Sequence, residues 1–196
     1  ILKCDIRKFF ASIDHTVLMN ILRTCISNDR LLALLENIVG SFCSTPGVEH
    51  IGLPLGNLTS QLLVNVYMNE FDQFMKHTLK VKYYVRYADD FVVLSHNKNL
   101  LLETLSYMKV FLRDKLKLEM HPDKVSITAL ASGVDFLGWV HFPDHRVLRT
   151  STKRRMLKAV NENPSEETVA SYRGMLSHGN TWKLRSALPH LPSGGR

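Results

Sequence analysis

The chain has 196 residues, 45% of them hydrophobic, which fits one compact domain with a sizeable core. Because 25 Lys and Arg residues outnumber 18 Asp and Glu residues, the formal net charge is +7, and this favours a polyanionic partner such as nucleic acid. Cys4, Cys25 and Cys43 are far apart and odd in number, which predicts a reduced, cytoplasmic setting without a disulfide framework, and no apolar run reaches the length of a membrane span.

The first predicted elements are a strand and a helix. The chain begins without an initiator Met and directly in a strand over residues 1–6, so we expect a fragment of a larger fold. A helix is predicted over 15–26, and Ser12 or Asp14 can accept hydrogen bonds from the free N–H groups of its first turn.

The remaining elements alternate between helices and strands. The second helix follows Asn28, its predicted cap, and carries apolar residues at three- and four-residue steps. In chain order we expect a helix over 29–42, a loop over 44–57, a helix over 58–79, strands over 83–87 and 91–94, a helix over 98–117, strands over 125–130, 135–141 and 146–149, helices over 152–161 and 165–177, and a loose tail from 188. This order predicts an α+β fold, with an antiparallel sheet and helices on one face.

Two adjacent aspartates, Asp89 and Asp90, lie between predicted strands, although strands disfavour Asp and neighbouring carboxylates repel. A tight hairpin turn over 88–90, with the acids at its tip, is sufficient to explain them. Asp5 ends the first strand, however, and would meet Asp89 at one end of the sheet if that strand lies beside the hairpin. Converging carboxylates repel unless a cation neutralises them, and their hard oxygen atoms suit Mg²⁺. Two such ions, about 3.5–4 Å apart, can activate a 3′-hydroxyl and stabilise a leaving pyrophosphate.

Four sequence motifs occur in the order found in reverse transcriptases. The string YADD at 87–90 resembles the Tyr-x-Asp-Asp motif of that family, CDIRKFFASID at 4–14 resembles its motif A, GLPLGNLTSQLLVNVYMNEFD at 52–72 resembles its motif B, and VDFLGW at 134–139 is similar to its primer grip. Motif B has Leu55-Gly56 where most reverse transcriptases have Gln-Gly, and Ser60-Gln61 where most have Ser-Pro. The Ser-Gln ending resembles the enzymes of diversity-generating retroelements, with group II intron enzymes as relatives.

The resemblance implies a polymerase palm over 1–149, with motifs A to E, and a partial helical thumb over 150–196. The fingers motifs that should precede residue 1 are missing. It implies an RNA-directed DNA polymerase that extends a DNA or RNA primer with dNTPs on an RNA template, using two Mg²⁺ or Mn²⁺ ions. The diversity-generating subfamily further implies error-prone copying and a basic accessory variability protein. The implied metal ligands are Asp5, Ile6, Asp89 and Asp90.

Motif A also contains the residues that the resemblance assigns to dNTP binding. Phe10, five residues past Asp5, matches the steric gate, a flat ring that leaves no room for a 2′-hydroxyl. The alternative is a core aromatic residue, and Phe9 is the better candidate for the core. Backbone N–H groups of Ile6 and of the residues after it would face the triphosphate. The further implied dNTP-binding residues are Arg7, Lys8, Phe9 and Tyr87.

In motif B, Gly56 allows the backbone to approach the nascent base pair closely. Leu55 in place of Gln removes a polar side chain from that pair, which would weaken geometric checking and fits error-prone copying at template adenines. Gln61 contacts the template strand or caps the helix that begins near Leu58, and the residues leave this choice open. Asn57 is another candidate cap.

Later residues have both a functional and a plain interpretation. Lys124 matches the motif-D lysine that protonates departing pyrophosphate, or it is an exposed turn lysine. A basic helix near 152–161 would contact phosphates of the template–primer duplex, or it is a solvated face. The resemblance implies that residues 136–139 form the turn that holds the primer end, and the alternative is a strand that packs its aromatic residues. The implied nucleic-acid-binding residues are Phe136, Leu137, Gly138, Trp139, Lys153, Arg154, Arg155 and Lys158. His141 and His145 flank a Pro-containing loop with no Cys nearby, and we do not expect a zinc site there.

Three other functions remain open. A group II intron-like or prophage defence reverse transcriptase would share the motifs without diversity-generating properties. A palm-type nucleotide cyclase could use the same carboxylates without nucleic acid, and it would need neither the basic helix nor the segment 136–139. A non-catalytic RNA-binding remnant would show no metal dependence.

Overall fold

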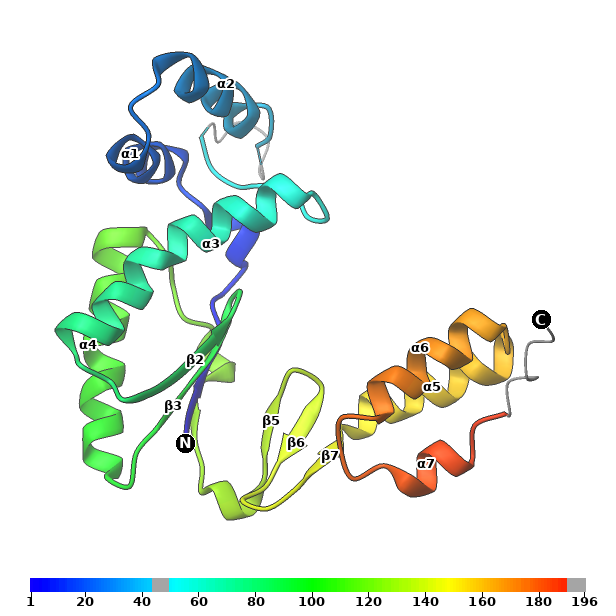
Figure 1. The fold of residues 1–196 in the computed structure, drawn as a ribbon. Coiled ribbons are helices and arrows are strands. Elements are labelled where there is room, and N and C mark those ends of the chain that lie inside the picture. Colours follow the sequence, from blue (N-terminus) through cyan, green and yellow to red (C-terminus); the bar gives the residue numbers. More distant parts are fainter. Residues whose placement is uncertain (44–49, 190–196) are drawn as a thin grey trace. The chain divides into compact units, whose positions relative to one another are not determined.

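A computed structural model describes residues 1–43 and 50–189 (Figure 1). The chain divides into two compact units, Ile1–Ile127 and Thr128–Arg196. The boundary predicted at residue 149 lies inside the second unit, and the division into palm and thumb stays a prediction. The first part of the loop predicted over 44–57 and most of the predicted tail from 188 lie outside the described residues.

The first unit is built on an antiparallel sheet with the strand order β2-β3-β1-β4. Its strands are β1 (Leu2–Cys4), β2 (Tyr83–Tyr87), β3 (Asp90–Leu94) and β4 (Ser126–Ile127). β1 pairs with β3 on one side and with β4 on the other, which confirms that the first strand lies beside the hairpin. The strands predicted over 1–6 and 125–130 are too long, since regular pairing stops at Cys4 and Ile127.

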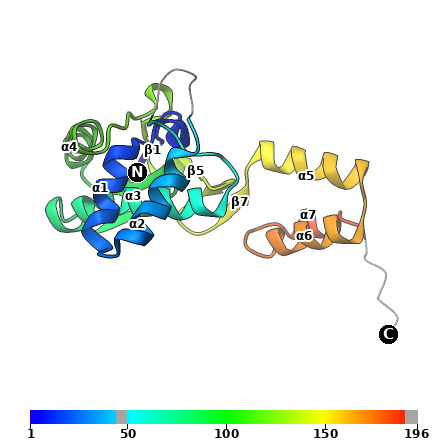
Figure 2. The same cartoon turned by 90° about the horizontal axis from the view of Figure 1, so that it is seen from above.

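The helices of the first unit are α1 (His15–Cys25), α2 (Asp29–Gly40), α3 (Leu58–Gln73) and α4 (Lys98–Leu116). Asp14, and not Ser12, caps α1 by accepting a hydrogen bond from the Val17 N–H at 2.9 Å, and Asn28 caps α2 as predicted. α1 packs against α2 and α3 (Figure 2). Within the described ranges, no helix has both the length and the apolarity needed to cross a membrane.

The long helix predicted over 58–79 begins at Leu58 as predicted but differs from the structure at its end. Its last turn, Phe74–Thr78, is a π-helix, in which a backbone N–H bonds to the carbonyl five residues earlier, as the Leu79 N–H does to the Phe74 carbonyl. At its start, Asn57 occupies the capping position but makes no side-chain hydrogen bond to the helix, so the capping role predicted for Asn57 is wrong.

The core of the first unit lies between the sheet and its helices. Leu2, Cys4 and Phe91 are fully buried on one face of the sheet, and the alternate residues Val85 and Tyr87 are exposed on the other. The ring of Phe71 in α3 lies 5.2 Å from that of Phe91 between ring centres. These contacts confirm the predicted α+β fold, an antiparallel sheet with helices on one face.

The second unit has its own small sheet and core. Strands β5 (Val134–Phe136), β6 (Trp139–His141) and β7 (Arg146–Leu148) pair in that order, and helices α5 (Thr150–Glu162), α6 (Glu166–Leu176) and α7 (Trp182–Ser186) follow. α5 and α6 lie side by side, with α7 next to α6 (Figure 2). Buried residues from β6, β7, helices α5 and α6 and the segment after α7 form the core: Trp139, Leu148, Met156, Val160, Val169, Leu176 and Leu188.

The single strand predicted over 135–141 is wrong. Leu137 and Gly138 have φ angles of 52° and 83°, and this left-handed backbone turns the chain back so that Phe136 pairs with Trp139. Helix α7 was not predicted, because the sequence around it has no clear apolar period.

Two glycines of the second unit should respond oppositely to alanine. Gly174 lies in α6 with open space around its Cα, so Gly174→Ala should stabilise the protein by about 0.5–1 kcal/mol through helix propensity. A Cβ at Gly179 would clash with the indole ring of Trp139, so Gly179→Ala should destabilise it by about 1–3 kcal/mol. Urea unfolding of both variants tests the packing, and equal effects of the same sign would contradict it.

Candidate active site

The pairing of β1 with β3 brings Asp5 and Asp90 together. Cys4 lies opposite Phe91, so the next residue on one strand and the preceding residue on the other are neighbours at the same end of the sheet. Asp5 is nine-tenths buried there. Burial raises the pKa of the Cys4 thiol to about 12, so Cys4 adds no negative charge beneath the two acids.

Asp89 lies in the turn between β2 and β3. Tyr87 pairs with Asp90, so the turn contains only Ala88 and Asp89, and Asp90 is the first residue of β3. The turn predicted over 88–90 is therefore one residue too long. Ala88 has a φ angle of 51°, a left-handed conformation that non-glycine residues seldom adopt. The structure thus brings together all three predicted carboxylates.

The electrostatics of these carboxylates reflect their crowding. Burial is the main cause that raises the pKa of Asp89, and the Asp5 carboxylate raises it further. Burial likewise raises the pKa of Asp90, where Lys3 opposes the shift and the carboxylates of Asp5 and Asp89 add to it. Negative charge is therefore disfavoured at both residues of the pair unless a cation compensates it.

Lys124 provides one such positive charge. It ends a short 3₁₀ helix, Pro122–Lys124, and its Nζ donates a hydrogen bond to Asp5 Oδ2 at 2.9 Å. This bond is the main cause that raises the pKa of Lys124, so the side chain stays an ammonium ion. Sequence reasoning proposed Lys124 for the site but did not predict this contact, because the two residues are 119 positions apart.

The backbone just before Lys124 holds Asp5 in place. The His121 N–H donates to the Asp5 carbonyl at 2.8 Å, and the Arg7 N–H donates to the Glu119 carbonyl at 2.8 Å. Ile6 forms an isolated antiparallel β-bridge with Met120, which lies between Glu119 and His121. The sequence pattern did not indicate this pairing, because residues 119–121 do not read as a strand.

A pocket of about 370 Å³ opens beside the acids. Phe9 is buried in the core and Phe10 is half-buried in the pocket wall, with an edge-to-face ring contact of 5.5 Å between them. This placement agrees with the division of the pair into core and pocket, and the gate role stays a prediction. The pocket is lined by Asp5, Ile6, Lys8, Phe9, Phe10, Ala11, Leu55, Asp89, His121 and Lys124.

The motif B residues are divided between two pockets. Leu55 is 78% exposed and lines the pocket beside the acids, whereas Gly56, with a φ angle of 91°, has open space around it. Gln61 and Tyr87 line a second pocket of about 370 Å³, together with Phe10, which borders both. Sequence reasoning missed three further polar residues near this second pocket, namely Asn65, Asp72 and Arg86.

The second unit contains the remaining predicted residues. Leu137, Gly138 and Trp139 line a pocket of about 470 Å³ with Arg149 and Arg155 at the start of α5. Phe136 is buried in the first strand of the small sheet. On α5 the basic side chains are all exposed, and they are Lys153, Arg154, Arg155 and Lys158. Exposure of these side chains is expected both for a solvated helix face and for a face that contacts phosphates, so the two interpretations stay predictions.

The donor chemistry of the three aspartates fits a divalent metal ion. Carboxylate oxygens are the ligands that Mg²⁺ prefers, and a cation would relieve the unfavourable negative charge of Asp89 and Asp90. In residues 1–43 and 50–189, however, no three His, Cys, Asp or Glu side chains are already arranged to hold an ion. Asp5 is instead paired with Lys124.

Comparison with known proteins identifies a family over most of the chain. A family model described as "Reverse transcriptase (RNA-dependent DNA polymerase)" matches residues 1–141. Protein YkfC of Escherichia coli is 26% identical, over 94% of this chain and 56% of its own length. The group II intron-encoded protein LtrA of Lactococcus lactis subsp. cremoris is 24% identical, over 77% of this chain and 35% of its own length. The chain therefore spans about half, or less, of these relatives.

Two solved structures are similar in fold. A telomerase from Candida albicans, in complex with a TWJ fragment of telomeric RNA, has a TM-score of 0.60 at 14% sequence identity. The match covers 89% of this chain and 34% of the telomerase chain. An apo telomerase from Candida tropicalis, truncated from the C-terminal domain, has a TM-score of 0.50 at 12% identity and covers 71% of this chain and 33% of its own. At these identities the likeness shows the fold alone.

Removing a crowded carboxylate should stabilise the folded chain near neutral pH. A folded pKa above the unfolded value means that protonation contributes stability at low pH, and this stability is lost as the pH rises through the folded pKa. Asp89→Asn should therefore raise the free energy of unfolding by roughly 0.5 kcal/mol at about pH 7, and by less at about pH 3. Urea unfolding at both pH values measures this.

Asp114→Asn is the matched control. Its hydrogen bond from Arg113 lowers the pKa of the Asp114 carboxyl, so the charged form is favoured and the amide should bring no stabilisation. Equal stabilisation by both substitutions, or a loss of stability in Asp89→Asn at neutral pH, would contradict the crowding of the acids.

Proposed function

The chain belongs to the reverse transcriptase family, and we infer that it is the catalytic part of an RNA-directed DNA polymerase that extends a primer with dNTPs on an RNA template. The observation that carries this proposal is the convergence of Asp5, Asp89 and Asp90 beside a pocket with Phe10 in its wall. A basic composition, with a net charge of +7, supports nucleic acid as the partner.

The carboxylates would hold the divalent metal ions that enzymes of this family generally use. Asp5 and Asp89 are the principal proposed ligands, with Asp90 beside them and the backbone of Ile6 as a further one. When bound, two Mg²⁺ or Mn²⁺ ions would activate the primer 3′-hydroxyl and stabilise the leaving pyrophosphate. The neighbouring Lys124 holds a proton on Nζ, which it could donate to that pyrophosphate.

The pocket walls would select and orient the incoming dNTP. The half-buried ring of Phe10 would lie under the sugar and exclude a 2′-hydroxyl. The left-handed backbone at Lys8, with a φ angle of 46°, turns the chain between the acid and the ring, where the N–H groups of Lys8 and Phe9 can face a triphosphate. The N–H of Arg7, predicted for the same role, is already bonded to the Glu119 carbonyl. Gln61 and Tyr87 in the second pocket are proposed contacts of the nascent base pair.

The second unit would contact the template–primer duplex. The turn at Leu137 and Gly138 is the proposed primer grip, and the exposed basic face of α5 is the proposed phosphate contact. Arg154 and Lys158 are one helical turn apart and share that face.

We further propose that the enzyme copies with frequent errors in a diversity-generating retroelement. The support is the exposed Leu55 in the pocket, where a polar Gln is usual, and the Ser60-Gln61 ending of motif B. A basic accessory protein would then be a partner, and the cysteine pattern favours the cytosol. The second candidate is a group II intron-like or prophage defence enzyme, which the likeness to LtrA favours.

Asp89→Asn should abolish primer extension by the full-length protein while primer–template affinity stays within about twofold, because the lost ligand serves the chemical step. Steady-state incorporation with Mg²⁺ or Mn²⁺ and an affinity titration measure the two effects, with Asp114→Asn as the control. Wild-type extension by Asp89→Asn would contradict the assignment. A cyclic product from free nucleotide would favour the cyclase, and RNA binding without extension by wild-type protein would favour the remnant.

The subfamily proposal is tested by the error spectrum. Wild-type protein should misincorporate mainly opposite template adenine, and Leu55→Gln should lower that error rate by about tenfold if the side chain meets the nascent pair. Leu62→Gln, an exposed leucine on α3 outside both pockets, is the control. Errors spread evenly over the four template bases would instead support the group II intron-like enzyme.

A further inference from the structure

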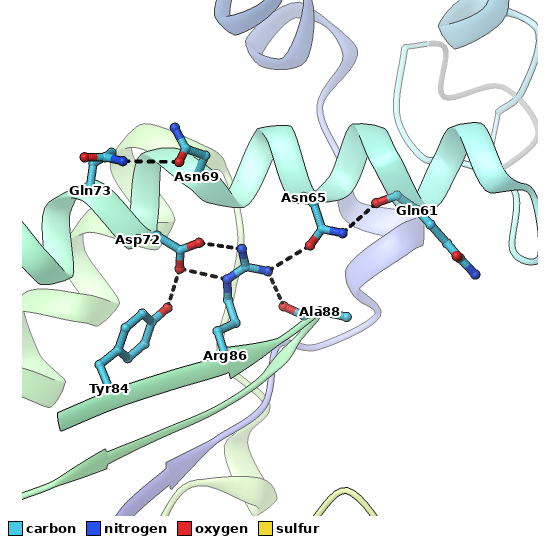
Figure 3. A network of polar contacts seen from close by, with 8 residues as sticks. All are labelled: Gln61, Asn65, Asn69, Asp72, Gln73, Tyr84, Arg86 and Ala88. Atoms are coloured by element: carbon cyan, nitrogen blue, oxygen red, sulfur yellow. Dashed lines mark hydrogen bonds and ion pairs between the residues drawn. The ribbon is translucent and has the colours of Figure 1, made fainter.

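The guanidinium of Arg86 lies between helix α3 and the tip of the β2–β3 hairpin (Figure 3). Its Nε donates to Asp72 Oδ1 at 2.8 Å and its Nη2 donates to Asp72 Oδ2 at 2.5 Å. Its Nη1 donates to Asn65 Oδ1 at 3.3 Å and to the Ala88 carbonyl at 3.1 Å. One bond from Nε, one from Nη2 and two from Nη1 use four of the five N–H groups of the side chain.

Asp72 anchors this guanidinium to a rigid element. It lies in the last turn of α3, next to the fully buried Phe71, and the Tyr84 hydroxyl donates a further hydrogen bond to its Oδ1 at 2.7 Å. The Arg86 side chain is only 9% exposed. Burial alone would lower the pKa of Arg86, but the Asp72 carboxylate outweighs it, so the charge is retained. A two-pronged Arg–carboxylate pair of this kind fixes direction as well as position.

The bond from Arg86 to Ala88 acts directly on the turn that carries Asp89. The accepting carbonyl belongs to the peptide unit that joins Ala88 to Asp89, and a peptide unit is planar. When Arg86 holds the Ala88 carbonyl oxygen, the orientation of this peptide plane is fixed. The Asp89 Cα belongs to the same plane, so the direction in which the Asp89 side chain leaves the backbone is restricted as well. Ala88 has a left-handed φ angle of 51°, a sparsely populated conformation that persists where surrounding contacts impose it.

We propose that Arg86 is a positioning residue, which transmits the rigid position of Asp72 on α3 to the peptide before Asp89 and so sets the direction of the Asp89 carboxylate. The proposal rests on the proposed function. Arg86 lines the second pocket and not the pocket beside the acids. Four of its five N–H groups are bonded within the protein, so its effect on the reaction passes through the turn. Lysine keeps the charge but has one nitrogen in place of the planar fork, so it cannot pair with both Asp72 oxygens and reach the turn as well.

A purely structural role for Arg86 makes a different prediction. If the side chain only tied the hairpin to α3, its loss would lower activity in proportion to the loss of folded protein. If it directs Asp89, the folded variant should bind its substrates normally and react slowly, since a misplacement of about 1 Å can cost on the order of 100-fold in rate.

The test compares Arg86→Lys with Tyr84→Phe in the full-length protein. Tyr84→Phe removes one bond to Asp72 but leaves the bond from Arg86 to Ala88, so it controls for loosening of the same anchor. Arg86→Lys should lower kcat for dNTP incorporation by about 10–100-fold, with the dNTP KM and the primer–template Kd within about threefold of wild type. Tyr84→Phe should lower kcat by no more than about threefold, at matched folded fractions determined from thermal melting.

Each result decides the proposal. A kcat of Arg86→Lys within about threefold of wild type, or equal losses in both variants once folded fractions are matched, would overturn the positioning role alone. If Arg86→Lys melts below the assay temperature, Asp72→Asn weakens the same fork and should show the same selective loss of kcat, and its absence there would overturn the role as well. A wild-type protein without primer extension would overturn the proposed function and, with it, the role that rests on it.

Discussion

Repulsion among Asp5, Asp89 and Asp90 is the constraint on which the first unit depends. Burial, with the neighbouring carboxylates adding to it, raises the pKa of Asp89 and of Asp90 at one end of a small sheet. Asp5 is held in place despite this crowding, because β1 lies between β3 and β4 and pairs with both strands. Lys124 then offsets part of the charge. A site that costs stability in this way is typical of catalytic centres, where charge is arranged for the reaction and not for the fold.

Sequence patterns predicted the parts of this arrangement that depend on local chemistry. Alternating and β-branched residues located β2 and β3, and Asp14 and Asn28 marked the starts of α1 and α2 through ordinary capping. The meeting of Asp5 with the hairpin was predicted on the condition that the first strand lies beside the hairpin, and the pairing of β1 with β3 meets that condition.

Contacts between distant segments could not be predicted in the same way. The bond from Lys124 to Asp5 and the backbone pairing of 119–121 with the start of the chain depend on how a loop returns to the sheet, and no periodicity records that. The left-handed Leu137 that splits the strand predicted over 135–141 is not visible in the hydrophobic pattern, because leucine rarely adopts such a conformation. Only the resemblance of residues 136–139 to the primer grip implied a turn there. Arg86 was missed because a charged residue in a strand is usually assigned to the solvated face, whereas here Asp72 neutralises it inside.

The left-handed backbone of Ala88 restricts which changes this position can accept by single-base mutation. One base change in an alanine codon leads to Val, Thr, Pro, Ser, Gly, or Asp or Glu. Branched side chains and the proline ring do not suit a φ angle of 51°, and an added acid would bring a fourth carboxylate to a crowded end of the sheet. Glycine alone adopts this conformation without steric cost, although it leaves the turn with more freedom in the unfolded chain. Serine is neither branched at Cβ nor charged, so it meets a backbone cost close to that of alanine. The residue next to the crowded acids therefore accepts few single-base changes, even though its own side chain is a single methyl group.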